Sequence, residues 1–104
     1  MSIKLIYVTT GSRAEAEKIA EAVVNERLAA CANILPGVTS VFHWEGNLCR
    51  EEETVLFLKT TEDRVEKLTE TIRALHSYEC PCIVALPVEG GNPAFLEWVE
   101  REVE

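Results

Sequence analysis

The order of apolar patterns along the chain constrains its fold more than any other feature of the sequence. Four β-rich segments alternate with two stretches in which apolar residues recur at helical spacing, and a short amphipathic stretch follows the last of them. The sequence therefore predicts strands at 3–10, 29–44, 54–60 and 80–88, and helices at 13–28, 62–75 and 93–103.

Capping residues and breakers indicate where several of these elements begin or bend. Ser12 and Glu15 form a capping box, in which each side chain satisfies a free backbone N–H at the start of the first helix. Asn92 is a favourable N-cap and Pro93 a favourable first residue for the last helix. Pro36-Gly37 interrupts the second strand, and because proline cannot donate to a ladder we expect a bend or bulge there.

The resulting order, β-α-β-β-α-β, is that of an α+β fold, the ferredoxin-like plait, here with an extra C-terminal helix. In this plait two helices cover one face of a four-stranded antiparallel sheet, and the other face stays bare. The run Val55–Leu58 is apolar on both sides of its strand. This run indicates a second covering layer, most simply another copy of the chain.

Length and charge narrow the class of protein. With 104 residues, of which 47% are hydrophobic, the chain is long enough for one domain, 1–104, with one real core. Its net charge of −8 and its scattered basic residues argue against nucleic acid and anionic membranes as partners, and favour cations. The N-terminus shows no secretory signal pattern, so we expect a cytoplasmic protein whose four cysteines are reduced thiols.

The strongest chemical signal is the stretch from His76 to Cys82, which holds an imidazole, a phenol, a carboxylate and two thiols. Thiolates and imidazole are ligands for Cu(I) and Zn(II), so His76, Cys80 and Cys82 are candidate metal ligands. In an extended strand the Cα atoms of the two cysteines would lie about 6.6 Å apart on one face, so their side chains must converge to share an ion. Simpler interpretations stay open: Cys82 as a small buried residue, and His76 as a residue that stabilises the last carbonyls of a helix.

The remaining chemistry-bearing residues have simple interpretations. Cys31 begins a strand among alanines and is expected to be buried, whereas Cys49 is expected in a polar turn as an exposed thiol. His43 is interpreted as a surface or packing residue, and Glu51–Glu53 as part of a solvated face. The sequence shows no phosphate-binding loop, nucleophile elbow or cysteine with an evident histidine and acidic partner, so these residues indicate no enzyme.

Several short motifs follow one another over essentially the whole chain. They are Glu26–Asn33, Pro36-Gly37, Ser40 through Trp44-Glu45-Gly46, Lys59-Thr60-Thr61, His76-x-Tyr78-Glu79-x-Pro81, Leu86-Pro87-Val88 and the helix that contains Trp98. Each motif is weak alone, and together they are specific. In this combination and order the chain resembles the CutA divalent-cation tolerance family.

The resemblance implies a ferredoxin-like subunit in a homotrimer, with the sheets facing the axis and the long second and third strands reaching between neighbours. It also implies tolerance of copper or another divalent cation. The resemblance further implies a copper site, which in some members of the family consists of a cysteine at the end of strand one, the motif histidine and a glutamate just after the motif proline. Here only His76 is retained, because Thr9 stands at the cysteine position and Cys82 at the glutamate position, while Ser77 replaces a motif proline and Cys80 adds a thiol. Two alternatives stay open: a rearranged site of His76, Cys80 and Cys82 that favours Cu(I), or a chain without a specific metal site.

The residues and the resemblance together favour a non-enzymatic homotrimer for metal tolerance that binds metal ions. The alternative is a signalling or scaffold trimer, similar to the PII proteins, that binds a small ligand or a protein in clefts between subunits. Gly46–Arg50 is then the candidate contact surface. An acylphosphatase-like enzyme shares the plait, and Arg13 lies at an expected helix N-terminus, a natural anion site. However, Thr9–Ser12 is not the glycine-rich phosphate loop of that family, which disfavours this class.

Overall fold

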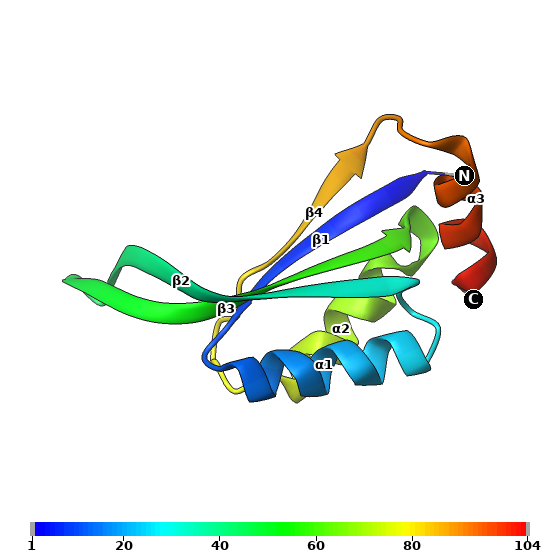
Figure 1. Cartoon of the computed structure of the whole chain (residues 1–104). Coiled ribbons are helices and arrows are strands. Elements are labelled where there is room, and N and C mark those ends of the chain that lie inside the picture. The colour runs from blue at the N-terminus through cyan, green and yellow to red at the C-terminus, as the bar shows by residue number, and fades with distance from the viewer. Residues whose placement is uncertain (1, 104) are drawn as a thin grey trace.

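The structure is a computed structural model and describes residues 2–103 of the chain. The predicted element order is confirmed, although the helix predicted over 62–75 starts with a 3-10 turn, as helices often do. No helix within the described residues is long and apolar enough to cross a membrane. The elements of the described chain (Figure 1) are β1 (Ile3–Thr10), α1 (Arg13–Asn25), β2 (Cys31–Trp44), β3 (Asn47–Thr61), η1 (Glu62–Arg64), α2 (Val65–Leu75), β4 (Ile83–Val88) and α3 (Pro93–Glu102).

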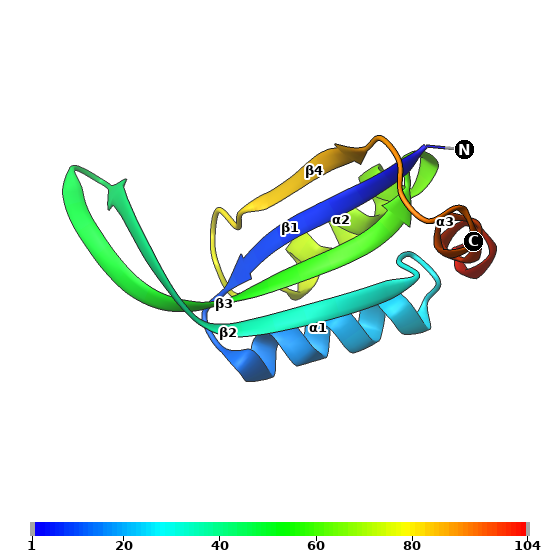
Figure 2. The ribbon, with the colours of Figure 1, turned by 45° about the horizontal axis from the view of Figure 1, so that its top comes forward.

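The strands β1 to β4 form one antiparallel sheet in the order β2-β3-β1-β4. α1 and α2 lie side by side on one face of the sheet, and α3 lies at the end where β1 begins (Figures 1 and 2). The central strands β1 and β3 pair without interruption from Ile3 opposite Thr61 to Thr10 opposite Thr54. This arrangement confirms the ferredoxin-like α+β plait.

The main core lies between the sheet and the two helices. Because successive side chains of a strand point to opposite faces, every second residue of β1 and β3 faces the helix layer. Each fully buried aliphatic side chain contributes roughly 1.5–3 kcal/mol relative to an exposed one, so this layer is the main source of stability. Its largest members are Ile6, Val8, Ile19, Val23, Leu56, Leu58, Leu68 and Ile72.

α1 ends at Asn25, before the predicted end at 28. Arg27 adopts a left-handed φ of +63°, and the N–H groups of Arg27 and Leu28 donate to the carbonyls of Val24 and Val23 at 3.0 Å each. These bonds form a Schellman motif, which satisfies the last carbonyls of the helix. Leu28 keeps helical spacing in the sequence because the residue after the left-handed position packs back onto the helix, and it lies in the core.

β2 and β3 extend past the rest of the sheet as a two-stranded hairpin arm, residues 38–53 (Figure 2). The pairing of the two strands shifts register between Leu35 and Val38. This shift confirms the irregularity expected at Pro36-Gly37, where the glycine has a φ of +78°. The arm therefore leaves the sheet at an angle that a regular ladder would not give.

The tip of the hairpin arm is a two-residue turn formed by Glu45 and Gly46, with φ values of +50° and +82°. Two successive positive φ values match the twist of the flanking strands. β3 therefore begins at Asn47, directly after the turn, and not at 54 as the sequence predicts. The acidic stretch before residue 54 hid this part of the strand from the apolar pattern.

β4 begins at Ile83 and not at 80 as predicted. Pairing with β1 starts at Ile83, and Pro81 has no N–H to donate to a ladder. Cys80 and Cys82 therefore lie in the loop before β4, so the geometry predicted for two cysteines on one strand face does not apply.

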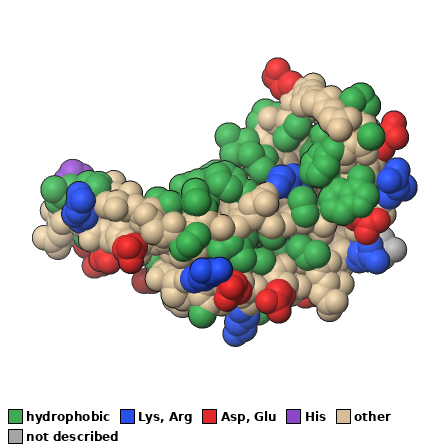
Figure 3. Space-filling model, viewed as in Figure 1, with side chains coloured by type: hydrophobic (Ala, Val, Ile, Leu, Met, Phe, Trp, Pro, Cys, Tyr) green, Lys and Arg blue, Asp and Glu red, His purple; other side chains and the backbone are tan. Residues whose placement is uncertain are grey.

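The sheet face opposite the helices, called here the open face, is uncovered in the single chain, and hydrophobic side chains gather along it (Figure 3). Tyr7 and Phe57 pack edge to face near its centre, with ring centroids 5.6 Å apart. Lys59 donates a hydrogen bond to Asn33 on the same face. An exposed apolar face of this kind marks an interaction surface. Its largest exposed apolar side chains are Leu35, Val84 and Leu86.

Candidate functional site

A polar cluster of Glu15, Glu53, His76 and Tyr78 lies where β1 ends. Glu15 comes from the first turn of α1, and Glu53 from the root of the hairpin arm in β3. His76 is the residue that ends α2, and Tyr78 follows it in the loop toward β4. The plait thus brings together residues from three separate segments: α1, β3 and the connection that follows α2.

The His76 side chain is fully shielded from solvent. Its Nε2 lies 2.8 Å from the carbonyl oxygen of Thr9, and the backbone N–H of Tyr78 donates to its Nδ1 at 3.1 Å. Because a carbonyl can only accept, the hydrogen bonds assign the neutral ring its Nε2-protonated tautomer. Both ring nitrogens are therefore used within the subunit.

Glu15 joins the start of α1 to the loop after α2. Its N–H donates to Ser12 Oγ at 3.1 Å, and its Oε1 accepts from the N–H of Gly11 at 3.2 Å, one residue before the N-cap. The predicted capping box is thus confirmed on the Ser12 side and shifted on the other. The other carboxylate oxygen, Glu15 Oε2, accepts from the N–H of Ser77 at 2.7 Å and lies 3.9 Å from His76 Nδ1. Burial raises the pKa of the Glu15 carboxyl, but hydrogen bonds from Ser77 and Gly11 and the proximity of His76 outweigh it, so the pKa is lowered.

Tyr78 joins the same loop to the hairpin arm. Its hydroxyl donates to Glu53 Oε2 at 2.8 Å, and its ring centroid lies 4.7 Å from that of His76. A Cβ at Gly11 would meet the Tyr78 hydroxyl oxygen at 3.3 Å, so a glycine leaves room for the phenol. Burial and then the neighbouring Glu53 raise the pKa of Tyr78 from 10.0 to about 12, so the phenol stays a hydrogen-bond donor above the pH at which an ordinary tyrosine ionises.

Glu53 is the cluster residue that sequence analysis missed. The sequence predicts Glu51, Glu52 and Glu53 as one solvated face, but Glu53 is only 7% exposed. The signal was its alternation with Val55 and Phe57, which lie on the same side of β3. The sequence predicts a strand that begins at 54, so the alternation pattern was not extended back to Glu53. Tyr78 packs its ring against His76, and its hydroxyl has a defined partner in Glu53.

The structure does not bring the three predicted metal ligands together. His76 lies in the polar cluster, whereas Cys80 is exposed and Cys82 is half-buried in the loop before β4. Among residues 2–103, no group of three or more histidine, cysteine, aspartate and glutamate side chains is arranged to hold a metal ion. One subunit therefore supplies no preformed three-ligand site, and the assignment of these residues as ligands stays a prediction.

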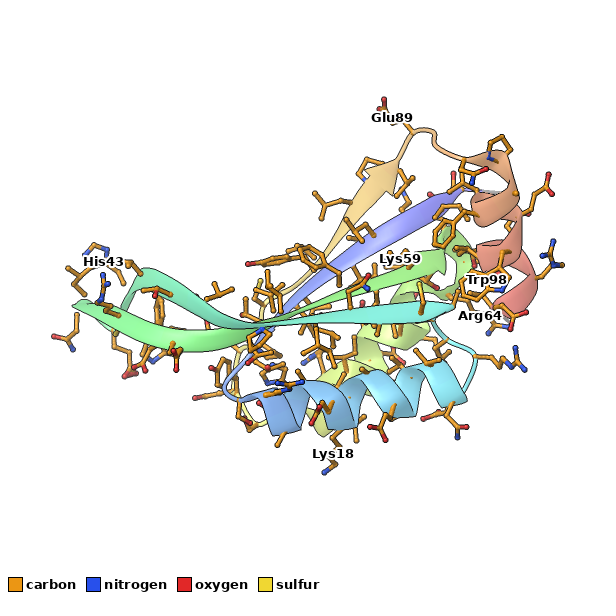
Figure 4. All side chains as sticks on the ribbon, in the orientation of Figure 1. Lys18, His43, Lys59, Arg64, Glu89 and Trp98 are labelled. Atoms are coloured by element: carbon orange, nitrogen blue, oxygen red, sulfur yellow. The ribbon has the colours of Figure 1, made fainter. Side chains whose placement is uncertain are left out.

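The other cysteines and His43 lie elsewhere. Cys31 starts β2 opposite Lys59 and is half-buried. Cys49 lies in β3 opposite Phe42 and is half-buried, so its predicted place as an exposed thiol in a turn is wrong. The cause is the early start of β3. His43 is exposed at the tip of the hairpin arm (Figure 4).

Fold and cluster together define a class of protein: a small plait subunit with one open sheet face, a projecting hairpin arm and a histidine–tyrosine–carboxylate cluster at the root of that arm. Residues 4–102 match the family described as CutA1 divalent ion tolerance protein. The chain belongs to this family, as the motifs in its sequence implied.

Curated relatives and solved structures agree with this assignment. A chloroplastic CutA protein of Arabidopsis thaliana is 43% identical over 97 residues, covering 93% of this chain and 53% of that protein. The divalent-cation tolerance protein CutA of Thermus thermophilus is 45% identical over 98 residues, covering 94% of this chain and 95% of that protein. The chain spans just over half the length of its plant and mouse relatives, 53% to 58%. The solved Cut A1 structure from Thermus thermophilus superposes with a TM-score of 0.96 at 42% identity, covering 98% of this chain and 99% of that one.

Proposed function

We propose that this chain forms a non-enzymatic cytoplasmic homotrimer that confers tolerance of divalent cations, copper in particular, and binds metal ions. Its membership of the CutA1 family over residues 4–102 is the observation that supports this most. The net charge of −8 attracts cations toward the surface. Its four cysteines are free thiols, which suits a reducing compartment.

Two further copies of the chain are the proposed cover of the open face. Leu56 and Leu58 are already buried under the helices, so Val55 and Phe57 supply the second apolar side of β3. Val55 is already buried, so the surface that association removes from water is that of Phe57 and of the exposed Leu35, Val84 and Leu86 on the same face. The hairpin arm projects from the subunit with Trp44 exposed near its tip, and we place it against a neighbouring subunit (Figure 1).

Cys80 and Cys82 are the proposed primary metal ligands, with His76 as the third. Thiolate sulfur selects soft ions, so the pair favours Cu(I). Both cysteines lie in a loop, where the backbone can adjust to bring the sulfurs together. His76 must first give up its hydrogen bond to Thr9 or to the N–H of Tyr78. We therefore expect the thiolates to supply most of the affinity.

The test is an anaerobic titration of the fully reduced protein with Cu(I) against a competing chelator. We expect tight binding of a single ion per subunit. Binding should be lost in Cys80→Ser/Cys82→Ser, weakened less in His76→Ala and kept in the control Cys31→Ser/Cys49→Ser. Weak binding that scatters over carboxylates, or equal binding by all variants, would contradict the proposed site.

A further inference from the structure

The loop between α2 and β4 is held at both ends and free of sheet pairing between them. At its start, Tyr78 is fixed by its hydrogen bond to Glu53. At its end, Ile83 pairs with Val8 in the sheet. Residues 79–82, Glu-Cys-Pro-Cys, lie between these anchors and outside the helices and strands of the described chain.

Cys80 and Cys82 are within reach of each other in this loop. Two residues of fully extended chain span at most about 7 Å, and disulfides form at Cα separations of roughly 4.4–6.8 Å. Only slight bending is therefore needed, and the bend breaks no ladder hydrogen bond because the pairing with β1 starts at Ile83. Pro81 between the two cysteines has no N–H that such a bend would unpair.

Cys31 and Cys49 are placed differently. Each is fixed in a ladder, Cys31 opposite Lys59 and Cys49 opposite Phe42. Cys31 and Phe42 are separated along β2 by roughly 35 Å at strand rise, so these two cysteines cannot pair within one subunit. The chain thus contains one thiol pair that can close and two thiols that serve as internal controls.

We propose that Cys80 and Cys82 are a redox modification site, which hydrogen peroxide converts into a reversible disulfide within one subunit. The sulfur of Cys80, the more exposed thiol, attacks one peroxide oxygen, the O–O bond breaks, and a sulfenic acid and water form. The sulfur of Cys82 then attacks the sulfenic sulfur, an S–S bond forms, and a second water leaves. The two thiols lose two electrons and two protons, and hydrogen peroxide is reduced to two waters.

An exposed disulfide in a short loop is readily reduced again, as labile and regulatory disulfides are. Oxidation also removes both thiolates, and the thiolate is the form of cysteine that binds metal ions. The oxidised chain should therefore bind Cu(I) much more weakly than the reduced chain. This consequence rests on the proposed function, whereas formation of the disulfide does not.

The experiment uses the metal-free protein. Fully reduced protein is treated with hydrogen peroxide equimolar to subunits, blocked with N-ethylmaleimide and digested with trypsin. Cleavage after Arg73 and Arg101 releases both loop cysteines on peptide 74–101, while Cys31 and Cys49 lie on peptide 28–50. We expect peptide 74–101 to lack the label and to be lighter by two hydrogen atoms, peptide 28–50 to be labelled at both cysteines, and dithiothreitol to reverse the change.

Two variants sharpen the result. Cys31→Ser/Cys49→Ser should behave like the natural chain, and Cys80→Ser should form no disulfide within peptide 74–101. Full labelling of peptide 74–101 after peroxide, a cross-link to peptide 28–50, a link between subunits or irreversible over-oxidation would each overturn the proposal. A closed disulfide together with no Cu(I) binding by the reduced protein would instead contradict the proposed metal function alone.

Discussion

The Tyr78 hydroxyl donates a hydrogen bond of 2.8 Å to the buried carboxylate of Glu53, which connects the loop after α2 to the root of the hairpin arm. The Tyr78 ring also lies against His76, whose side chain is bonded to the end of β1. The loop that contains the proposed redox and metal chemistry therefore shares an anchor with the arm that is proposed to contact a neighbouring subunit.

Tyr78→Phe should destabilise the protein by roughly 1 kcal/mol, because it removes a hydrogen bond to a charged acceptor from a partly exposed site. The measurement is chemical denaturation at a fixed protein concentration, with Tyr7→Phe as the matched control. In Glu53→Gln the same Tyr78 substitution should cost less, since the acceptor is no longer charged. Equal costs in both backgrounds would mean that the contact does not couple the two residues.

Tyr78 should also ionise late in an alkaline titration. Its pKa is raised from 10.0 to about 12, and an acid with a raised folded-state pKa contributes stability that is fully present below the unfolded value. That stability is lost as the pH rises from 10.0 toward about 12. Tyrosinate absorbance should show a late step that is absent in Tyr78→Phe and present in Tyr7→Phe. A late step that survives in Tyr78→Phe would refute the assignment.

Glu15 should contribute to the acid limb of stability. Its pKa is lowered below 4.5, so its contribution is present above that value and is lost as the pH falls through the folded-state pKa. Glu15→Gln should therefore be less stable than the natural chain at neutral pH, with a difference that narrows at acid pH. Denaturation midpoints between about pH 6 and pH 3 measure this difference. The exposed Glu21→Gln on the same helix, which also removes one carboxylate, is the control.

Arg27→Gly should stabilise the protein, because residue 27 ends α1 with a left-handed φ of +63° that suits glycine. The side chain also forms an exposed ion pair with Glu102 at 2.8 Å, so the comparison is made in a Glu102→Gln background. There we expect a gain of up to about 1 kcal/mol in the free energy of unfolding. Arg27→Ala loses the same side chain but keeps the Cβ that disfavours a left-handed φ, so it should give no gain in the free energy of unfolding. Equal stability of the two variants would show that backbone strain at residue 27 is negligible.

Local patterns were enough to predict the fold, because helix and strand periods alternate cleanly and Ser12, Glu15 and Pro36-Gly37 mark their boundaries. Details that depend on contacts between residues distant in the sequence could not be predicted from local patterns. A left-handed Arg27 has no signal of its own, since glycine is the usual residue there. The role of His76 depends on the Thr9 carbonyl, which only the folded sheet places beside it.

The candidate site was predicted in part for the same reason. The stretch from His76 to Cys82 was recognised by its composition, but its partners Glu15 and Glu53 come from α1 and β3. Acidic residues in a chain with a net charge of −8 are common, so composition cannot single out the buried one. Extending the alternation of β3 back from Val55 would have placed Glu53 on the same side of the strand as Val55 and Phe57.

The open face should prove to be the trimer interface. Val84 and Leu86 of β4 lie on it beside Tyr7 and Leu5 of β1, and both are more than 40% exposed in the single chain. Replacing both with aspartate would bury charge in the proposed interface, a cost that association cannot offset. We therefore expect Val84→Asp/Leu86→Asp to sediment as monomers at micromolar concentration, where the natural chain sediments as trimers.

The matched control is Ala14→Asp, an apolar-to-acid change on the exposed side of α1, which should leave the trimer intact. Because unfolding of a trimer is linked to dissociation, the natural chain and this control should also melt at temperatures that rise with protein concentration, whereas the double variant should not. A natural chain that is monomeric at micromolar concentration, or a double variant that stays trimeric, would place the subunit contacts elsewhere. The apolar side chains of β4 would then need a partner other than a copy of this chain.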